Sequence, residues 1–572
     1  MLKKKFSPDI FFYVILALAV FLPRAFALDR FATTDEPEWL GQSGNFYYAL
    51  GQREPAETYR REHPAVTTLW AGAAGYLTAI PEYRGWGQGY LETTRTESYL
   101  REKGVEPIDV LAAGRFFLVL ATTILLTASF YFAQRLFGKE HALVGMLLAA
   151  FDPFHTALSR VLHIDSTLSN LILLTALAYM SYLYTGRRRV DLAAAGAAAG
   201  LTLMTKTPGL FLFPFIGLLA GVAYFQERCS RGSSSQWEGF KRAAVPFLAW
   251  ALILGISFFV LWPAMWVKPL EVINDTFVKA VRYASGGHTK ALFFNGHIFK
   301  DGSIGWDYFY YYPLTFLWRT TPIVMLGLIA ALAGFFWRIP PVDDELTRKG
   351  LAGLFYLAFF YMAFMTLGLK KFDRYGLPAY LPLDLIAGVG LIALTARLRE
   401  YIKRLQSQAA AAAFVLVLLL AQLAGTLRFF PYYFSYYNPV MGGTAKAPQV
   451  MLVGWGEILD QVGAYLNQQP GAQDSSAISC FQVGALSYFY DGTVVRPFEI
   501  FPEMEPKYIN QLLEADYFVD YIQCRQLGDN VFWEQYQPMH MIEYRGIEYA
   551  RIFDLSQITF PDYISASIDG TE

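Results

Sequence analysis

The sequence predicts an α-helical multi-pass membrane protein with a small extracytoplasmic α/β domain at its C-terminal end. Of its 572 residues, 54% are hydrophobic and 17% are aromatic. Charged residues reach only 17%, whereas soluble domains have roughly 25%. Apolar runs long enough to cross a bilayer recur along the chain as far as residue 427 and then give way to shorter strand and helix patterns.

Composition also excludes several classes of protein. The formal net charge is −1, so the chain has no overall basic field with which to bind nucleic acid. Its three cysteines are too few for a disulfide scaffold. The mean hydropathy of +0.29 leaves room for sizeable polar parts outside the membrane.

The first apolar run, Ile10–Leu28, follows a basic start that contains Lys3–Lys5. It is long for the apolar region of a signal peptide, so we expect a retained first spanning helix. Ala25–Phe26–Ala27 has the small-x-small pattern of a cleavage site. A cleaved signal peptide therefore remains the alternative.

Ten more apolar runs bring the expected number of spanning helices to about eleven. The stretch from 192 to 225 is divided at Lys206, because basic connections flank it on both sides and a second helix returns the chain to the same face. The runs are Phe116–Gln134, Ala142–Leu158, Thr167–Thr185, Leu192–Thr205, Thr207–Phe225, Ala243–Trp262, Thr320–Trp337, Leu351–Leu369, Tyr375–Ala396 and Ala409–Leu427.

The distribution of Lys and Arg sets the predicted orientation. With the N-terminus in the cytoplasm, every inner connection is basic, as the positive-inside rule requires. The outer side then receives two long loops, residues 29–115 and 263–319, and the C-terminal part of the chain. From residue 440 onward, 18 Asp and Glu stand against 6 Lys and Arg. We therefore expect a protein of the cell (inner) membrane with an acidic outer side.

We divide the chain into a transmembrane module over residues 1–440 and an extracytoplasmic α/β domain over residues 441–572. An aromatic run, Phe430–Pro439, joins them and is typical of a membrane interface. Within the domain we expect a helix over Gly456–Gln468, buried strands over Ala477–Phe481 and Tyr517–Ile522, and a hairpin over Met539–Phe553 that turns at Arg545–Gly546.

Two details of this domain stay open in the sequence. Cys480 and Cys524 either pair, if their strands are neighbours in an oxidising exterior, or remain free buried thiols. Gly454–Trp455–Gly456 is half of a phosphate-loop pattern, but the third glycine is absent. A tight turn is therefore the favoured interpretation.

Charged residues next to the outer ends of helices are the candidates for chemistry, because polar groups at membrane depth are expensive unless they serve a site. The first group follows the first span and contains Asp35 and Glu36. One of two adjacent carboxylates can take a proton from an incoming hydroxyl while the other orients it or holds a cation. The alternative is a solvated helix N-terminus with acidic first-turn residues and Pro37 at an early helical position.

The second group lies between two apolar helices and contains Arg160, His163 and Asp165. Asp165 serves as an N-cap of the next helix, as a site residue, or as both. His155, His163 and Asp165 are an option for a metal site, but their spacing matches no strong ligand signature. No cofactor is therefore certain, and a divalent metal stays an option.

The third group is Lys370, Lys371 and Arg374, which breaks the positive-inside rule. Three outer cations at the mouth of a helix pair suggest a bound anion, and a lipid phosphate is the natural candidate. The alternative is that they meet outer-leaflet headgroups or the acidic C-terminal domain. Further candidates are Lys206 and Arg160 for the same phosphate, and His63 and Tyr375 for substrate binding.

Together, these segments resemble the GT-C membrane glycosyltransferases. The segments are Asp35–Glu36, Ser159–Asp165, Thr205–Lys206 and Lys371–Pro378. More narrowly, the chain is similar to bacterial relatives of protein O-mannosyltransferases and of lipid A aminoarabinose transferases, the family 39 type group. Each motif is short, but their order, sidedness and helix positions agree. The resemblance covers roughly residues 1–440 and implies nothing for the C-terminal domain.

This resemblance implies a sugar donor linked to polyprenyl phosphate and an acceptor hydroxyl on a protein, lipid or glycan. By position in the motifs, Asp35 is the general base, with Glu36 beside it, and Asp165 is the aspartate of the second group. The first outer loop lacks a histidine-rich metal signature, so no metal is carried over from the family.

The predicted function is an inverting glycosyltransferase at the outer face of the membrane. A transporter or flippase of lipid-linked sugars is the alternative, since it also needs outer cations. Transport usually requires ionisable or broken segments near the membrane midplane. Here the apolar cores hold few charges, Asp384 being one, and the notable polar residues gather at one face. This placement favours the transferase.

Overall fold

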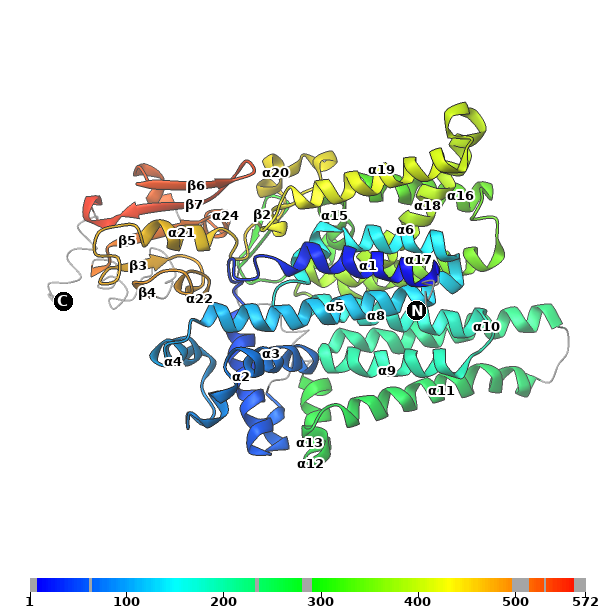
Figure 1. Ribbon diagram of the computed structural model, residues 1–572, viewed down its shortest axis with the longest axis horizontal. Helices are drawn as coiled ribbons and strands as arrows, with labels where there is room; N and C mark the ends of the chain where they lie inside the picture. Colours follow the sequence, from blue (N-terminus) through cyan, green and yellow to red (C-terminus); the bar gives the residue numbers. More distant parts are fainter. Residues whose placement is uncertain are drawn as a thin grey trace, which may run out of the picture.

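A computed structural model describes residues 8–60, 64–231, 236–279, 291–495, 514–528 and 531–559. Most of the long helices run side by side along the long axis of the molecule, and a β-sheet domain lies at one end of them (Figure 1). The predicted class, a multi-pass helical membrane protein with a C-terminal domain that contains a mixed sheet, is confirmed. The end of the bundle that carries this domain is called the domain end below.

Seven of the described helical segments are long and apolar enough to cross a membrane. They are α5 (Pro107–Phe137), α8 (Asp165–Tyr184), η4 (Thr207–Phe211) with the first part of α10 (Leu212–Arg231), most of α11 (Gln236–Val260), α17 (Glu345–Thr366), η7 (Asp373–Ala379) with α18 (Tyr380–Tyr401), and α19 (Gln408–Leu427). A bent pair that contains α15 (Tyr311–Arg319) and α16 (Pro322–Trp337) raises the number to eight if it forms one span.

By length and composition, the structure therefore supports fewer spans than the eleven predicted. Three of the predicted runs are helical as expected, but their helices are too short to pass this test of length and composition. They lie in the same bundle as the long helices (Figure 1). These helices are α1 (Pro8–Ala25), α6 (Lys139–Ala150) and α9 (Arg189–Thr205).

One break divides the run predicted as a single helix over Ala142–Leu158. Helix α6 ends at its Ala150, and a short helix, α7 (Pro153–Leu158), begins after Asp152. The Asp152 side chain accepts a hydrogen bond of 2.6 Å from the backbone N–H of His155, which is an N-cap contact. The turn leads directly into the loop that carries His163.

The predicted division at Lys206 is confirmed. Helix α9 ends one residue before it, η4 begins one residue after it, and Lys206 itself has the extended conformation, with φ −160° and ψ 143°. Two helices therefore occupy this stretch, and the lysine lies at their junction.

A close contact of glycines holds η7 and α18 in the bundle. A Cβ built on Gly388 of α18 would lie 2.3 Å from the Cα of Gly145 in α6. Close backbone approach through small residues is common between membrane helices. At the start of the same segment, Ser169 of α8 donates a hydrogen bond of 3.2 Å to the carbonyl of Leu377. These contacts fix the residues of η7 beside the first turns of α8.

The two long loops fold into short elements around the domain end. The first contains α2 (Glu36–Gln52), α3 (Val66–Ala79) and α4 (Thr96–Glu102). The second contains α12 (Ala264–Val267), α13 (Pro269–Ile273) and the antiparallel strands β1 (Leu292–Phe294) and β2 (His297–Phe299).

The C-terminal domain contains a five-stranded sheet in the order β4-β3-β5-β7-β6. Strand β3 is parallel to β4 and β5, and β7 is antiparallel to β5 and β6. The predicted strands are β3 and β5, and the hairpin turns at Arg545 and Gly546, which both have positive φ. The strands are β3 (Ser476–Ser479), β4 (Thr493–Val495), β5 (Tyr517–Tyr521), β6 (His540–Tyr544) and β7 (Ile547–Asp554), and the helices are α20 (Gly443–Lys446), α21 (Leu459–Leu466), α22 (Val483–Ser487) and α24 (Ile522–Gln526).

Cys480 and Cys524 form a disulfide bond. Cys480 follows β3 and Cys524 lies in α24, directly after β5, so the parallel pairing of these two strands brings the cysteines together. Of the two alternatives that the sequence leaves open, the paired one is therefore correct.

The aromatic run Phe430–Pro439, which the sequence placed at a membrane interface, lies largely inside the protein. The hydroxyl of Tyr433 donates to the carbonyl of Pro23 in α1 at 2.8 Å. The hydroxyl of Tyr432 donates to Asp460 in α21 at 2.7 Å. The run therefore joins the sheet domain to the helices through buried hydrogen bonds, because its rings have protein partners on both sides.

Candidate active site

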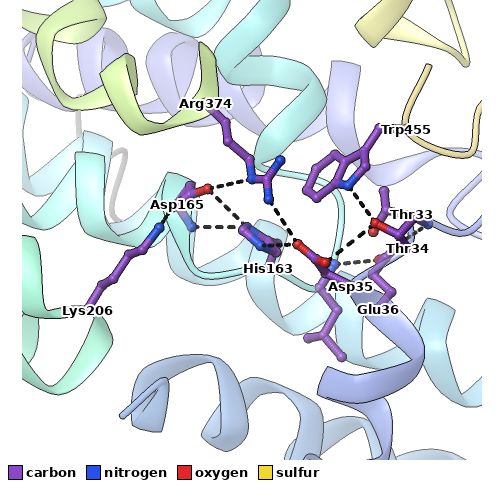
Figure 2. Close-up of polar contacts among 10 residues, drawn as sticks. Thr33, Thr34, Asp35, Glu36, His163, Asp165, Lys206, Arg374 and Trp455 are labelled. Atoms are coloured by element: carbon purple, nitrogen blue, oxygen red, sulfur yellow. Dashed lines mark hydrogen bonds and ion pairs between the residues drawn. The ribbon is translucent and has the colours of Figure 1, made fainter. Parts of the chain in front are cut away.

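Asp35 lies at the N-cap position of α2, but its side chain does not cap the helix. Its Oδ2 atom lies 3.2 Å from Nε2 of His163 and accepts a hydrogen bond of 3.3 Å from Arg374. Its Oδ1 atom accepts a longer bond of 3.4 Å from the hydroxyl of Thr34. Figure 2 shows these contacts. The side chain is 37% exposed, so the carboxylate is both held by the protein and open to solvent.

Asp165 is the first residue of α8, and its side chain makes no cap hydrogen bond either. Oδ1 accepts a hydrogen bond of 2.7 Å from Nζ of Lys206, and Oδ2 lies 3.4 Å from Nε of Arg374. The side chain is only 2% exposed. Of the roles that the sequence left open for Asp165, the N-cap is thus wrong and the site residue remains.

His163 and Arg374 connect the two carboxylates. Nε2 of His163 lies 3.2 Å from Oδ2 of Asp35, and Nδ1 lies 3.4 Å from Oδ2 of Asp165 and accepts from the backbone N–H of Asp165 at 3.4 Å. Arg374 reaches both aspartates through different nitrogens. We call Asp35, His163, Asp165, Lys206 and Arg374 the carboxylate cluster (Figure 2).

The cluster keeps Asp35 ionised. The packing of protein around the carboxyl would by itself raise its pKa, but the hydrogen bond from His163 and the charges of Arg374 and Lys206 outweigh that effect. The pKa of Asp35 is therefore held well below its ordinary value. A carboxylate that stays charged can accept a proton from a hydroxyl placed against it.

Glu36 is fully buried and serves a different purpose from Asp35. Arg115 of α5 pairs with both of its oxygens, with an Nε–Oε1 distance of 2.7 Å. The backbone N–H groups of Thr33 and Leu162 donate to the same carboxylate at 2.9 and 2.6 Å. The alternative of a solvated helix N-terminus is therefore wrong for Glu36, which ties the loop of Asp35 to the loop of His163.

Two of the predicted phosphate-binding cations bind backbone carbonyls instead. Arg160 donates to the carbonyls of Phe26, Ala27 and Pro431 and so fixes the end of α1. Lys371 donates to the carbonyls of Ile304 and Gly368, and burial lowers its pKa to about 8. Both side chains therefore make structural contacts, because their N–H groups donate to backbone carbonyls where the chain turns.

Three further residues were predicted to bind substrate or phosphate, namely Tyr375, Lys370 and His63. Tyr375 lies at the cluster, with Nζ of Lys206 4.0 Å from the centre of its ring. Lys370 lies near enough to act electrostatically on Tyr375. His63 lies outside the described residues.

The three residues of the metal option do not converge. The ring nitrogens of His155 contact Arg24 at 3.1 Å and Asn170 at 2.9 Å, so they are not available to a metal beside His163. Among the residues that the structure describes, no group of three or more His, Cys, Asp and Glu could hold a metal ion.

Comparisons with known proteins identify what this chain is similar to. Residues 109–235 match the family model described as dolichyl-phosphate-mannose-protein mannosyltransferase. The Saccharomyces cerevisiae protein O-mannosyltransferase Pmt1–Pmt2 complex bound to the sugar donor is similar in structure, with a TM-score of 0.50 and 11% identity over 75% of this chain and 91% of that chain. The chain has the GT-C glycosyltransferase fold.

Two other solved structures resemble this GT-C chain. One is ArnT from Cupriavidus metallidurans bound to undecaprenyl phosphate, with 12% identity, 95% of this chain and 97% of that chain covered, and a TM-score of 0.48. The other is the Archaeoglobus fulgidus oligosaccharyltransferase tethered with an acceptor peptide, with 12% identity, coverages of 96% and 74%, and a TM-score of 0.46. None of the curated protein sequences matches the chain.

The predicted resemblance is thus confirmed for the fold, and residues 109–235 carry the match to the family model. In this GT-C chain the segment that matches the family model includes His163, Asp165 and Lys206, three of the five cluster residues. The sugar and the acceptor are separate questions.

Trp455, which sequence analysis named only as part of a glycine turn, is a neighbour of the cluster. Its indole N–H donates to Thr34 at 2.9 Å, and Cζ of Arg374 lies 4.5 Å from the centre of its ring (Figure 2). Gly454 and Gly456 have φ of +92° and +111°, so the predicted tight turn is correct. An aromatic residue at the tip of a glycine turn was the available signal, because such a turn presents its side chain outward.

Proposed function

We propose that this protein transfers a sugar from a polyprenyl-phosphate donor to an acceptor hydroxyl at the outer face of the membrane, with Asp35 as the general base. One observation carries the proposal: Asp35 is an ionised, partly exposed carboxylate at a helix start that does not cap its helix. Helix starts favour acidic residues as caps. A carboxylate that is held elsewhere by His163 and Arg374 therefore points to chemistry.

The proton acceptor of this reaction is Oδ1. Oδ2 already contacts His163 and Arg374, whereas the described contact of Oδ1 is the long hydrogen bond from Thr34. Oδ1 is therefore the oxygen of Asp35 that an acceptor hydroxyl can most easily approach. Asp165, which is buried, keeps Lys206 and Arg374 in place.

Arg374 and Lys206 are the cations for the donor phosphate. A guanidinium has five N–H donors, and the contacts of Arg374 with Asp35 and Asp165 occupy only part of them. Lys206 lies on the other side of Asp165, with its ammonium over Tyr375. A phosphate held between these cations lies next to Asp35, which is where the sugar must meet the acceptor.

The proposed reaction follows from this arrangement. Asp35 removes the proton of the acceptor hydroxyl, and the oxygen forms a bond to the anomeric carbon of the sugar. The bond between that carbon and the phosphate oxygen breaks from the opposite face, with inversion, and the electron pair leaves with the polyprenyl phosphate. The phosphate gains negative charge as it leaves, so nearby cations bind the transition state more strongly than the ground state.

Donor binding also activates the base in this scheme. A phosphate on Arg374 brings a negative charge close to Asp35, and like charges raise the pKa of a carboxyl. Asp35 is then a stronger base with the donor bound than without it. This coupling suits an enzyme that must not deprotonate hydroxyls before the donor is present.

The test is transfer of radiolabelled sugar by purified wild-type protein and by Asp35→Asn. A panel of polyprenyl-phosphate sugars is offered in membranes that contain native acceptors. We expect Asp35→Asn to lower the rate by about 10²- to 10⁴-fold, the usual contribution of a positioned base, with donor binding retained. Asp29→Asn, a carboxylate-to-amide change at an exposed position of the same loop, is the matched control.

Full activity of Asp35→Asn contradicts the assignment of the base. Donor that is bound but consumed by neither protein contradicts the transferase. That second outcome favours the transport of lipid-linked sugars instead.

A further inference from the structure

The C-terminal domain contacts the acidic segment Ala32–Pro37 on both sides of Asp35. A Cβ built on Gly456 would lie 2.0 Å from the carbonyl oxygen of Ala32, and one built on Gly484 would lie 2.5 Å from Cγ of Pro37. Neither position has room for a side chain. The backbone of the domain therefore rests directly on the segment that carries the proposed base.

Between these two contacts, Trp455 reaches the segment through a hydrogen bond. Its indole Nε1–H donates to Oγ1 of Thr34 at 2.9 Å, and Thr34 in turn donates to Oδ1 of Asp35 at 3.4 Å. An indole N–H is a donor and never an acceptor. The oxygen of Thr34 must therefore accept from Trp455, which leaves its hydroxyl proton for Asp35.

The ring of Trp455 also contacts the two groups that hold the other oxygen of Asp35. The guanidinium of Arg374 lies 4.5 Å from the ring centre, a cation–π distance. The ring of His163 meets it edge-on, with centroids 5.1 Å apart and an interplanar angle of 83°. One residue of the C-terminal domain thus contacts Thr34, His163 and Arg374, which together surround Asp35 (Figure 2).

The turn that carries Trp455 is held from inside its own domain. The backbone N–H of Trp455 donates to the carboxylate of Glu457, which is 1% exposed. The next backbone N–H, of Gly456, donates to the hydroxyl of Tyr521 in β5 at 3.2 Å. The backbone of this turn is therefore held by the sheet domain, and its indole reaches across to the helical part of the chain.

We propose that Trp455 is a positioning residue for Asp35 and that the C-terminal domain is, through it, a part of the active site. Trp455 acts through Thr34, whose hydroxyl it aims at Oδ1, and through the ring contacts that steady Arg374 and His163. This inference rests on the proposed function, and it gives the C-terminal domain a role that the family resemblance does not imply.

The kinetic test is a double-mutant cycle. Trp455→Phe keeps a ring but removes the N–H, and Thr34→Val keeps the shape but removes the hydroxyl. We expect each to lower kcat by about 2- to 12-fold, the contribution of one ordinary hydrogen bond, with little change in the KM for the donor. Because both changes break the same relay, the double variant is expected to be no slower than the worse single variant.

Two further variants guard against a merely structural effect. Thr34→Ser keeps the hydroxyl and is expected to restore most of the rate lost in Thr34→Val. Trp306→Phe is the matched control, since Trp306 is 59% exposed and lies in the other long loop. If the fold-reduction of kcat in the double variant equals the product of the two single reductions, Trp455 and Thr34 act independently. That result would overturn the proposal.

A measurement without substrate separates this proposal from the proposed function. We expect the peptide covering residues 29–40 to exchange its amide hydrogens faster in Trp455→Phe and in Thr34→Val than in the wild type. In the double variant, exchange is expected to be as fast as in the single variants. Unchanged exchange in Trp455→Phe would overturn the inference. If the wild type transfers no sugar but exchange responds as expected, the proposed function fails while the coupling of the domain to Asp35 stands.

Discussion

Arg374 donates a hydrogen bond of 3.3 Å to Asp35, a residue 339 positions earlier in the chain. The bond has two consequences in the proposed reaction. It holds Asp35 in the charged state when no donor is present, and it uses one donor of a guanidinium that can bind a phosphate with the others. The base and the donor site therefore share a residue, and the properties of one depend on the occupancy of the other.

This sharing predicts a difference between two pH profiles. The acid limb of kcat/KM reports the free enzyme, in which the pKa of Asp35 is held well below its ordinary value. The acid limb of kcat reports the donor complex, in which the negative phosphate raises that pKa. We therefore expect kcat to fall at a higher pH than kcat/KM as the solution is acidified. Coincident acid limbs would contradict a shared Arg374.

Replacement of His163 is expected to shift the acid limb of kcat/KM. The hydrogen bond from His163 is the strongest of the influences that lower the pKa of Asp35. In His163→Ala the pKa rises, so Asp35 becomes protonated at a higher pH and activity is lost earlier on acidification. In His163→Gln an amide N–H can replace the ring N–H, and we expect a smaller shift. An unchanged acid limb in His163→Ala would show that another group limits the rate in acid.

A change of Arg374 to lysine tests the geometry of the cation rather than its charge. A lysine ammonium cannot reach both aspartates and a phosphate in the way a planar guanidinium does. We expect Arg374→Lys to lower kcat/KM for the donor by about 10- to 100-fold, the scale of one charge-assisted hydrogen bond. Arg428→Lys, an exposed arginine that follows α19, serves as the control. Equal activity of the two variants would exclude Arg374 from the donor site.

Glu36 is predicted to matter for stability. Removal of one partner from a buried ion pair leaves an uncompensated charge and typically costs about 3–5 kcal/mol. We therefore expect Arg115→Met to lower the Tm in detergent more than the double change Glu36→Gln/Arg115→Met, in which no charge is left buried. The measurement is thermal unfolding, with the exposed Glu82→Gln as the control. A single variant that is as stable as the double variant would contradict this account.

The sequence predicted the membrane fold, the strands of the C-terminal domain and the two aspartates of the cluster, because hydropathy and charge patterns are local. The local pattern did not separate Asp35 from Glu36, and only the family resemblance singled out Asp35 as the base. These neighbours point in different directions from a helix start, and their partners, His163 and Arg115, are far away in the chain. Trp455 was missed for the same reason: 421 positions separate it from Thr34, and no local pattern determines how a sheet domain rests on a helical bundle.

The number of spans and the outer cations show a second limit of local patterns. Apolar runs such as α6 were long enough in sequence, but a proline and the Asp152 cap ended the helix early. Lys371 and Arg374 looked equivalent as outer cations, yet carbonyls surround one and carboxylates the other. Tertiary contacts decide whether a cation binds a ligand or a backbone carbonyl, and a local sequence pattern does not determine these contacts.

Lys371 provides the last prediction, because its pKa is lowered to about 8 by burial. The unfolded chain keeps the ordinary lysine pKa of about 10.4, so between these two values the unfolded state binds more protons than the folded state. Stability contributed by Lys371 must then rise with pH across this window. We expect Lys371→Met to flatten the rise of Tm between about pH 8 and pH 10 and to leave sugar transfer per folded molecule close to that of the wild type.

The same change at Lys206, which contacts Asp165, is expected to impair transfer, since that ammonium belongs to the carboxylate cluster. A loss of transfer in Lys371→Met with an unchanged Tm would return Lys371 to the donor site and contradict its assignment to the carbonyls of Ile304 and Gly368.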